Sequence, residues 1–283
     1  MTRRPFAVLA VVASLAGCAD SGPSKKQYLA KVDPICKAAT SEAIALTTPT
    51  DIAALRQFHI KLADGVDKTL AGIDAVTFPS GEDGKAAKAW VQAMRDAAAA
   101  ARAVAPAVDK SDYGATETTA RKAAEAFKGA DSLARTFGSA ECGRGEAEAA
   151  ERMTIALVKT VKGAFVRAAD ALCKAAWTTY DALEPPETLP QVKTYFEKGN
   201  AIEEKLIADL RAIPAPLTDK DKLDEALAAF DAMLAKEKEV LAAAAAGNER
   251  ATDDLWEQAD KLSVTAMGKA DAYGFVDCGS QVS

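Results

Sequence analysis

The chain has 283 residues and a formal net charge of −6 at pH 7, with Lys and Arg interspersed among Asp and Glu. An acidic surface of this kind argues against nucleic acid as a partner and gives no electrostatic attraction to anionic lipid. The length suffices for one large domain or two modest ones. Alanine is abundant, and Pro and Gly cluster between long periodic stretches, so the sequence favours helices and predicts no strand.

The N-terminus has the pattern of an export signal. Arg3 and Arg4 precede a short apolar run over residues 6–15, whereas a helix that spans a bilayer needs about 20 apolar residues. Residues 1–17 are therefore interpreted as a lipoprotein signal peptide that is cleaved. The segment around the cleavage point, Leu15-Ala16-Gly17-Cys18, resembles the lipobox of bacterial lipoproteins.

This resemblance implies that the sulfur of Cys18 carries a diacylglycerol and that the protein is lipid-anchored to the extracytoplasmic face of the cell membrane. An ordinary signal peptide with a chance cysteine is the alternative. Residues 2–6 also resemble a twin-arginine motif, so the general secretory and twin-arginine export routes both stay open. The small, polar segment 18–26 is expected to be a flexible tether. Without residues 1–17, 33 basic residues stand against 41 acidic ones and the formal charge is −8.

Two parts of the chain match each other. Tyr28–Ala39 aligns with Phe165–Ala176 at an offset of 137 residues, and Phe137–Gly143 aligns with Tyr273–Gly279 at an offset of 136. A single net gap between such matches indicates an internal duplication. The predicted domains are a first helical repeat over 27–143, a helical connector over 144–164 and a second helical repeat over 165–283.

Apolar residues recur at three- and four-residue steps, which predicts four helices in each copy. Ser80 and Thr218 are candidate N-caps of the third helices. Short connections favour antiparallel neighbours, so we expect an all-α fold of two tandem up-down repeats, each resembling a four-helix bundle. The expected helices are 28–46 and 165–183, 52–76 and 189–213, 82–108 and 219–246, and 115–137 and 249–273.

The cysteines support the duplication. With Cys18 assigned to the lipid, four remain, and four cysteines allow three pairings. Because each copy must once have folded alone, we expect the disulfides Cys36–Cys142 and Cys173–Cys278. Each would close a loop of about 100 residues and contribute about 4–5 kcal/mol in the chain-entropy model, and export to an oxidising compartment favours both. The spacing fits no zinc motif, so we expect no metal.

The helix with Asp170 and Cys173-Lys-Ala, the proline-bearing loops, and the terminal Tyr273-Gly-x-x-x-Cys278-Gly also form a pattern. It resembles a group of exported actinobacterial proteins to which no function is assigned. The resemblance implies a helical, disulfide-closed domain and supplies no activity. The tandem arrangement departs from single-copy members of that group.

Few residues are suited to catalysis. His59 is the only histidine and is interpreted as structural. No nucleophile motif, phosphate loop or helical Glu-x-x-His is present. The pairs Glu203/Glu204 and Glu237/Glu239 alternate with lysines, and such runs are usually solvated helix faces. We therefore expect neither an enzyme nor a cofactor.

Two aromatic residues depart from the repeat. Trp177 and Tyr180 stand where the first copy has Thr40 and Ala43, and they share one helical face. The hypothesis is that they line a pocket or a partner surface at the end of the bundle; the alternative is that they fill the core. Trp90 and Trp256 are most simply core residues.

The preferred interpretation is a non-enzymatic binding or scaffold module in the cell envelope, with an unknown envelope protein as its partner. The alternative is a carrier of a small apolar ligand or solute in a cavity of the helical bundle. Either protein would contact the membrane through its N-terminal lipid. Oligomeric state and the packing of the two repeats stay open.

Overall fold

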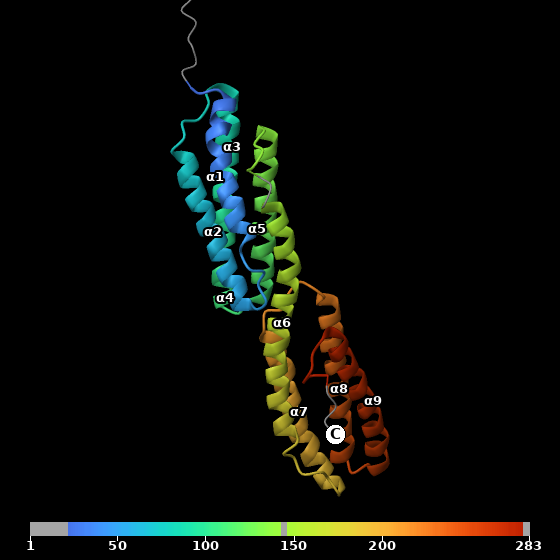
Figure 1. Cartoon of the computed structure of the whole chain (residues 1–283). Coiled ribbons are helices and arrows are strands. Elements are labelled where there is room, and N and C mark those ends of the chain that lie inside the picture. Colours follow the sequence, from blue (N-terminus) through green and yellow to red (C-terminus); the bar gives the residue numbers. More distant parts are fainter. Residues whose placement is uncertain (1–21, 143–145, 280–283) are drawn as a thin grey trace, which may run out of the picture.

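The computed structural model describes residues 22–142 and 146–279, so the predicted signal peptide and Cys18 lie outside the described residues. Within these ranges the chain is all-α, with nine helices and no strand (Figure 1). The helices are α1 (Lys25–Ile44), α2 (Ile52–Asp74), α3 (Gly81–Arg102), α4 (Val104–Asp109), α5 (Tyr113–Phe137), α6 (Glu146–Tyr180), α7 (Leu189–Ala212), α8 (Lys220–Ala245) and α9 (Glu249–Tyr273).

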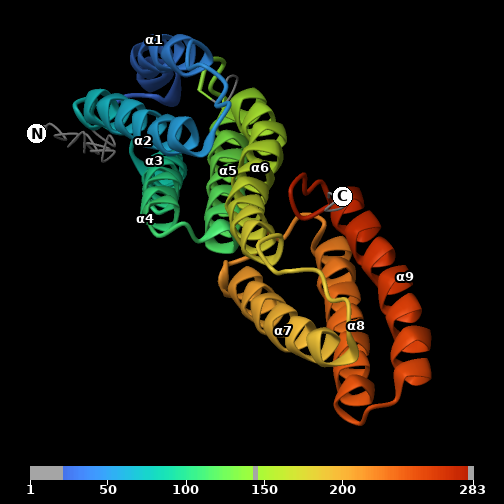
Figure 2. The same ribbon diagram turned by 90° about the horizontal axis from the view of Figure 1, so that it is seen from below.

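The helices form two bundles, named here the first bundle (α1–α5) and the second bundle (α6–α9). Figures 1 and 2 show α6 lying beside α5 at its start and reaching the second bundle at its end. This helix has 35 residues, and the predicted boundary between residues 164 and 165 falls inside it without a break. The internal duplication itself stays a prediction. Within residues 22–142 and 146–279, no helix combines the length and hydrophobicity that crossing a bilayer requires.

Short polar side chains and glycines set the ends of several helices. The side chains of Asp51, Asp112 and Asn248 each accept a hydrogen bond from a backbone N–H in the first turn of the helix that follows. Gly138 and Gly274 end α5 and α9 with φ of 92° and 112°, a left-handed conformation that favours glycine. The glycine in the aromatic-Gly-x-x-x-Cys pattern is therefore the residue that stops the last helix of each bundle.

The helix expected over 82–108 is interrupted. It ends at Arg102 and a separate helix, α4, begins at Val104. Pro106 lies in the first turn of α4, and because proline has no N–H, the carbonyl of Arg102 loses its partner. The Ser80 prediction is correct in position, since Ser80 is the N-cap of α3, although its side chain forms no capping hydrogen bond.

Both predicted disulfides are confirmed. Cys36 in α1 is joined to Cys142 after α5, and Cys173 in α6 is joined to Cys278 after α9, with Cα–Cα distances of 5.0 and 5.1 Å. Asp170 lies one helical turn before Cys173 in α6. Its carboxylate accepts hydrogen bonds from the backbone N–H groups of Val276, Asp277 and Cys278, which holds the segment around Cys278 in place beside the disulfide. Each bridge thus fixes the segment after the last helix of a bundle to a helix at its start.

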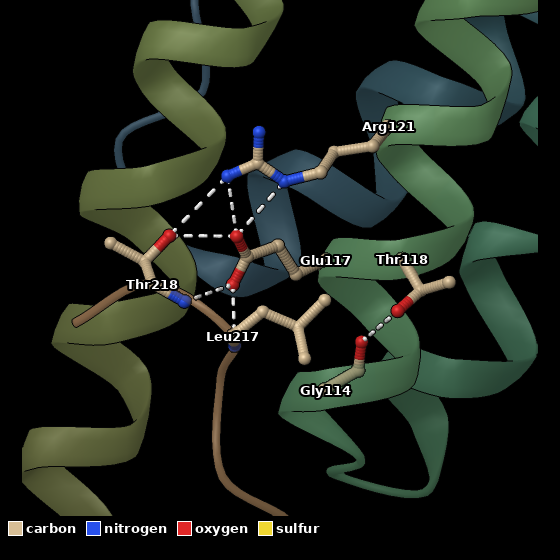
Figure 3. Close-up of polar contacts among 6 residues, drawn as sticks. All are labelled: Gly114, Glu117, Thr118, Arg121, Leu217 and Thr218. Carbon is tan, nitrogen blue, oxygen red and sulfur yellow. Dashed lines mark hydrogen bonds and ion pairs between the residues drawn. The ribbon is translucent and has the colours of Figure 1, made fainter. Parts of the chain in front are cut away.

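A buried carboxylate connects the two bundles (Figure 3). Glu117 of α5 is fully buried and accepts the backbone N–H groups of Leu217 and Thr218 and the hydroxyl of Thr218, at 2.8, 3.0 and 2.7 Å. Arg121, one turn later, also donates to Glu117. The prediction that Thr218 caps α8 is therefore wrong: Asp219 occupies the N-cap position, and Thr218 is bonded to the first bundle.

Apolar packing continues across the same junction. The ring of Tyr113 in α5 meets the ring of Phe165 in α6, with centroids 5.9 Å apart. Leu55 and Val104 of the first bundle belong to the buried cluster that includes Phe165. The two bundles consequently share one stretch of core at the junction, and the distal half of the second bundle projects from it.

Candidate functional site

A cavity of about 590 Å³ opens in the second bundle, away from the junction. Side chains from α6, α7, α8, α9 and the connection between α6 and α7 line it. The volume lies within the range of small-molecule sites, roughly 300–1,000 Å³. Its lining has three chemical components: five aromatic rings (Trp177, Tyr180, Tyr195, Phe196, Trp256), two thioethers (Met233, Met267) and four carboxyl groups (Asp181, Glu203, Glu237, Asp260).

The two residues singled out in the sequence, Trp177 and Tyr180, both line this cavity. The indole N–H of Trp177 donates to the backbone carbonyl of Asp277 at 3.0 Å, and only 7 % of this side chain is exposed. Trp177 meets Tyr180 edge to face, with ring centroids 6.3 Å apart. One face of α6 therefore presents both rings, held by the segment that follows α9.

Tyr180 packs directly on the backbone of α7. A Cβ atom at Gly199 would lie 3.0 Å from Cε2 of the Tyr180 ring, so a larger residue there would displace the ring. Burial, a hydrogen bond with Tyr195 and the charges of Glu203 and Glu237 raise the pKa of Tyr180. Its hydroxyl is therefore neutral throughout the physiological range.

The remaining rings form a connected group across α7 and α9. Tyr195 is edge to face with Tyr180 and stacked with Trp256, at centroid distances of 5.6 and 6.3 Å. Trp256 also meets Phe196 edge to face at 5.1 Å. Trp256, interpreted from the sequence as a core residue, is only partly buried and lines the cavity. The wall is therefore built from aromatic rings on three helices.

Two glutamates lie deep in the cavity, contrary to the sequence prediction of solvated faces. Glu203 of α7 is 3 % exposed and Glu237 of α8 is 7 % exposed. The lysines that suggested solvated pairs bind the other member of each pair: Lys238 lies 2.6 Å from Glu204, and Lys236 lies 2.7 Å from Glu239. The prediction failed because it assigned one environment to neighbours that point in different directions.

The two buried acids influence each other. Burial, a hydrogen bond with Glu237 and the charge of Glu237 raise the pKa of Glu203 well above its usual range. Burial and the charge of Asp260 also raise the pKa of Glu237, whereas the hydrogen bond with Glu203 acts to lower it. Without a ligand the pair therefore retains a proton.

The equivalent region of the first bundle has a different character. The alignment of the two halves places Glu203 at Val66 and Tyr180 at Ala43. Buried positions along α3 and α8 recur at an offset of 136 residues, which places Glu237 at Ala101. Val66 and Ala43 line a cavity of only about 100 Å³. A charged residue opposite an apolar one in the alignment was the signal that could have identified the two glutamates.

The only histidine lies elsewhere. His59 is in α2 of the first bundle, 1 % exposed, with no hydrogen-bond partner for either ring nitrogen among the described residues. Burial lowers its pKa to about 4, so it is a neutral core residue. Across the described ranges, no group of three or more His, Cys, Asp or Glu side chains is arranged to hold a metal ion.

The cavity is thus suited to holding a small molecule between acidic and aromatic groups. Comparison of the chain with protein-family models, curated proteins and solved structures gives no match.

Proposed function

We propose that the chain is an envelope lipoprotein, anchored through Cys18 at the extracytoplasmic face of the membrane, that binds a small solute in its second bundle. The resemblance of residues 15–18 to a lipobox supports the anchor. The two disulfides are in keeping with an oxidising compartment. The observation that carries the binding function is the cavity of about 590 Å³ with two buried glutamates in its lining.

This cavity favours the carrier interpretation over the scaffold interpretation. A partner protein usually covers a broad surface of about 800 Å² on each side, whereas a concave site with a few buried polar groups suits a small ligand. Four helices supply most of its lining residues, so their side chains are held on rigid elements. Binding without catalysis is proposed because the only histidine is neutral, buried and in the other bundle.

Native mass spectrometry of the full-length lipoprotein, extracted from its own membrane in mild detergent, tests solute binding. Ser263 lines the cavity from α9, and Ser263→Trp would fill it; Thr265→Trp, on an exposed face of the same helix, is the matched control. We expect wild type and Thr265→Trp to carry a bound small molecule that Ser263→Trp lacks. A wild-type protein without any bound mass, or equal retention by Ser263→Trp, would reject the proposal.

The anchor is tested separately. Cys18→Ala should abolish lipid attachment, and the protein should then leave the membrane fraction or keep its signal peptide. Mass spectrometry of the N-terminal peptide should find a diacylglyceryl group on Cys18 of the wild type. An unmodified Cys18 at a processed N-terminus would contradict the lipobox interpretation and would leave solute binding unaffected.

A further inference from the structure

The charged side chains that line the cavity are all acidic. Four carboxyl groups line it, and no Lys, Arg or His does so within the described ranges. Asp181 and Asp260 are exposed, whereas Glu203 and Glu237 are buried. A ligand that enters therefore meets a negative potential at the opening and two further acids inside.

Both buried acids have an oxygen without a partner. Oε2 of Glu203 and Oε2 of Glu237 are shielded from solvent, and neither has a hydrogen-bond partner in the part of the chain that the structure describes. Buried polar groups are normally hydrogen-bonded, and an unpartnered one is costly. The two lysines that flank Glu237 are bound to Glu204 and Glu239, and Lys205, the lysine closest in sequence to Glu203, is bound to Asp209. Within the described residues these oxygens therefore stay available to a positive charge or a hydrogen-bond donor that a bound molecule brings.

The aromatic wall restricts what the bound group can be. The rings of Tyr180, Tyr195 and Trp256 border the same cavity as the two glutamates. The face of an aromatic ring attracts a cation, most strongly in Trp, and this attraction increases where water is excluded. Met233 and Met267 add polarizable, apolar surface. Together, the carboxylates, aromatic rings and thioethers favour a ligand that has a positively charged group attached to apolar carbon atoms.

We propose that the bound solute is a small organic ammonium ion, whose charge lies against Glu203 and Glu237 and whose carbon atoms contact the aromatic wall. This assignment rests on the proposed solute-binding function. A bare divalent ion fits less well, since Ca²⁺ takes about 6–8 oxygen ligands, and the described residues contain no cluster suited to a metal. A neutral polyol fits less well because it needs donors as well as acceptors, and the lining is rich in acceptors.

Binding should be coupled to proton release. Without a ligand the pair of glutamates retains a proton, because burial raises both pKa values and the interaction with Glu237 raises that of Glu203 further. The other ionisable groups that face the pair are Tyr180 of α6, Tyr195 of α7 and Asp260 of α9. Tyr180 is neutral and Asp260 adds negative charge, so the proton that an incoming ammonium ion displaces comes from the pair. Affinity should therefore rise with pH.

Isothermal titration calorimetry with matched probes tests the assignment. Tetramethylammonium, choline and 1,5-diaminopentane are the cationic probes, and 3,3-dimethylbutan-1-ol is a neutral analogue of choline with the same shape. We expect at least one cation to bind and the neutral alcohol to bind roughly 30-fold more weakly or not at all, as for the loss of a buried charge contact. Titrations in buffers of different ionisation enthalpy should show proton release.

Substitutions identify the groups involved. Glu203→Gln and Glu237→Gln should each weaken binding of the cation by roughly 30-fold and reduce proton release. Glu204→Gln, the exposed neighbour paired with Lys238, should leave both unchanged. Circular dichroism of each variant checks that the helices are retained.

The outcomes separate the two proposals. If the neutral alcohol binds as tightly as choline, or if both buried Gln variants bind as well as wild type, the ammonium assignment is overturned. The ammonium assignment is also overturned if no cationic probe binds while native mass spectrometry still detects a bound molecule. In that case the proposal of solute binding stands. If no probe binds and no bound molecule is found, both proposals fail.

Discussion

Glu117 of α5 accepts the backbone N–H of Thr218 at 3.0 Å, and through this contact the first bundle holds the connection between α7 and α8 of the second. Burial alone would raise the pKa of Glu117, but hydrogen bonds from Thr218 and Arg121 outweigh it and the pKa is lowered. Glu117 is therefore ionised in the folded protein. Its stabilising contribution should be complete above pH 4.5, the ordinary pKa, and should decline as the pH falls below that value.

Removing this carboxylate should destabilise the junction. Glu117→Ala leaves the N–H groups of Leu217 and Thr218 and the charge of Arg121 without their acceptor, and we expect a loss of about 3 kcal/mol in the free energy of unfolding. Urea unfolding at pH 7 measures it. Glu125→Ala, an exposed position on α5 paired with Lys128, should cost less than about 0.5 kcal/mol. Equal losses for the two variants would show that the junction contributes no special stability.

Two glycines of α5 offer a second test of the same contact. A Cβ atom at Gly114 would lie 2.7 Å from the backbone oxygen of Ala215, whereas a Cβ atom at Gly129 would meet nothing within 4 Å. Gly129→Ala should therefore stabilise the protein by about 0.5–1 kcal/mol through helix propensity. Gly114→Ala should destabilise it by about 1–3 kcal/mol because the two segments overlap. Thermal or urea unfolding compares them, and stabilisation by Gly114→Ala would contradict close packing of the α7–α8 connection on α5.

His59 should make stability depend on pH. Burial lowers its pKa to about 4 in the folded protein, whereas the unfolded chain takes up this proton near pH 6.5. Stability is therefore lost as the pH falls from 6.5 towards 4, by about 2–3 kcal/mol at pH 4.5. His59→Leu removes this contribution, so its loss of stability between pH 7 and pH 4.5 should be smaller than that of wild type by the same amount. Parallel profiles would show that the imidazole is not held neutral.

The sequence predicted the parts of the fold that depend on local patterns. Apolar spacing and capping residues determine where helices form, and the aligned cysteines identified both disulfides. The sequence does not predict the break between α3 and α4, since small and apolar residues continue past Pro106 to the end of the helix expected over 82–108. The contact of Glu117 with Thr218 could not be predicted, since it joins residues 101 positions apart in different bundles.

The site was predicted in part for a similar reason. Trp177 and Tyr180 could be predicted because the alignment of the two halves places them opposite the small residues Thr40 and Ala43. Glu203 was misjudged from its charged neighbours, although it lies on the apolar stripe of α7, at helical spacing from Phe196 and Leu210. A charge on such a stripe is buried when the helix packs, and periodicity predicts that outcome better than local composition does.

The buried glutamate should make the empty protein less stable than it could be. The raised pKa of Glu203 means that the folded state retains a proton that the unfolded chain releases above pH 4.5, so its destabilising effect grows as the pH rises. Glu203→Gln should thus increase the free energy of unfolding by about 1–2 kcal/mol at pH 8 and by much less at pH 4.5. Glu204→Gln should show no such trend, because Glu204 is exposed and paired with Lys238. A binding residue is expected to lower the stability of the unoccupied site, so a Glu203→Gln variant no more stable at pH 8 than wild type would argue against a buried, unpartnered acid at this position.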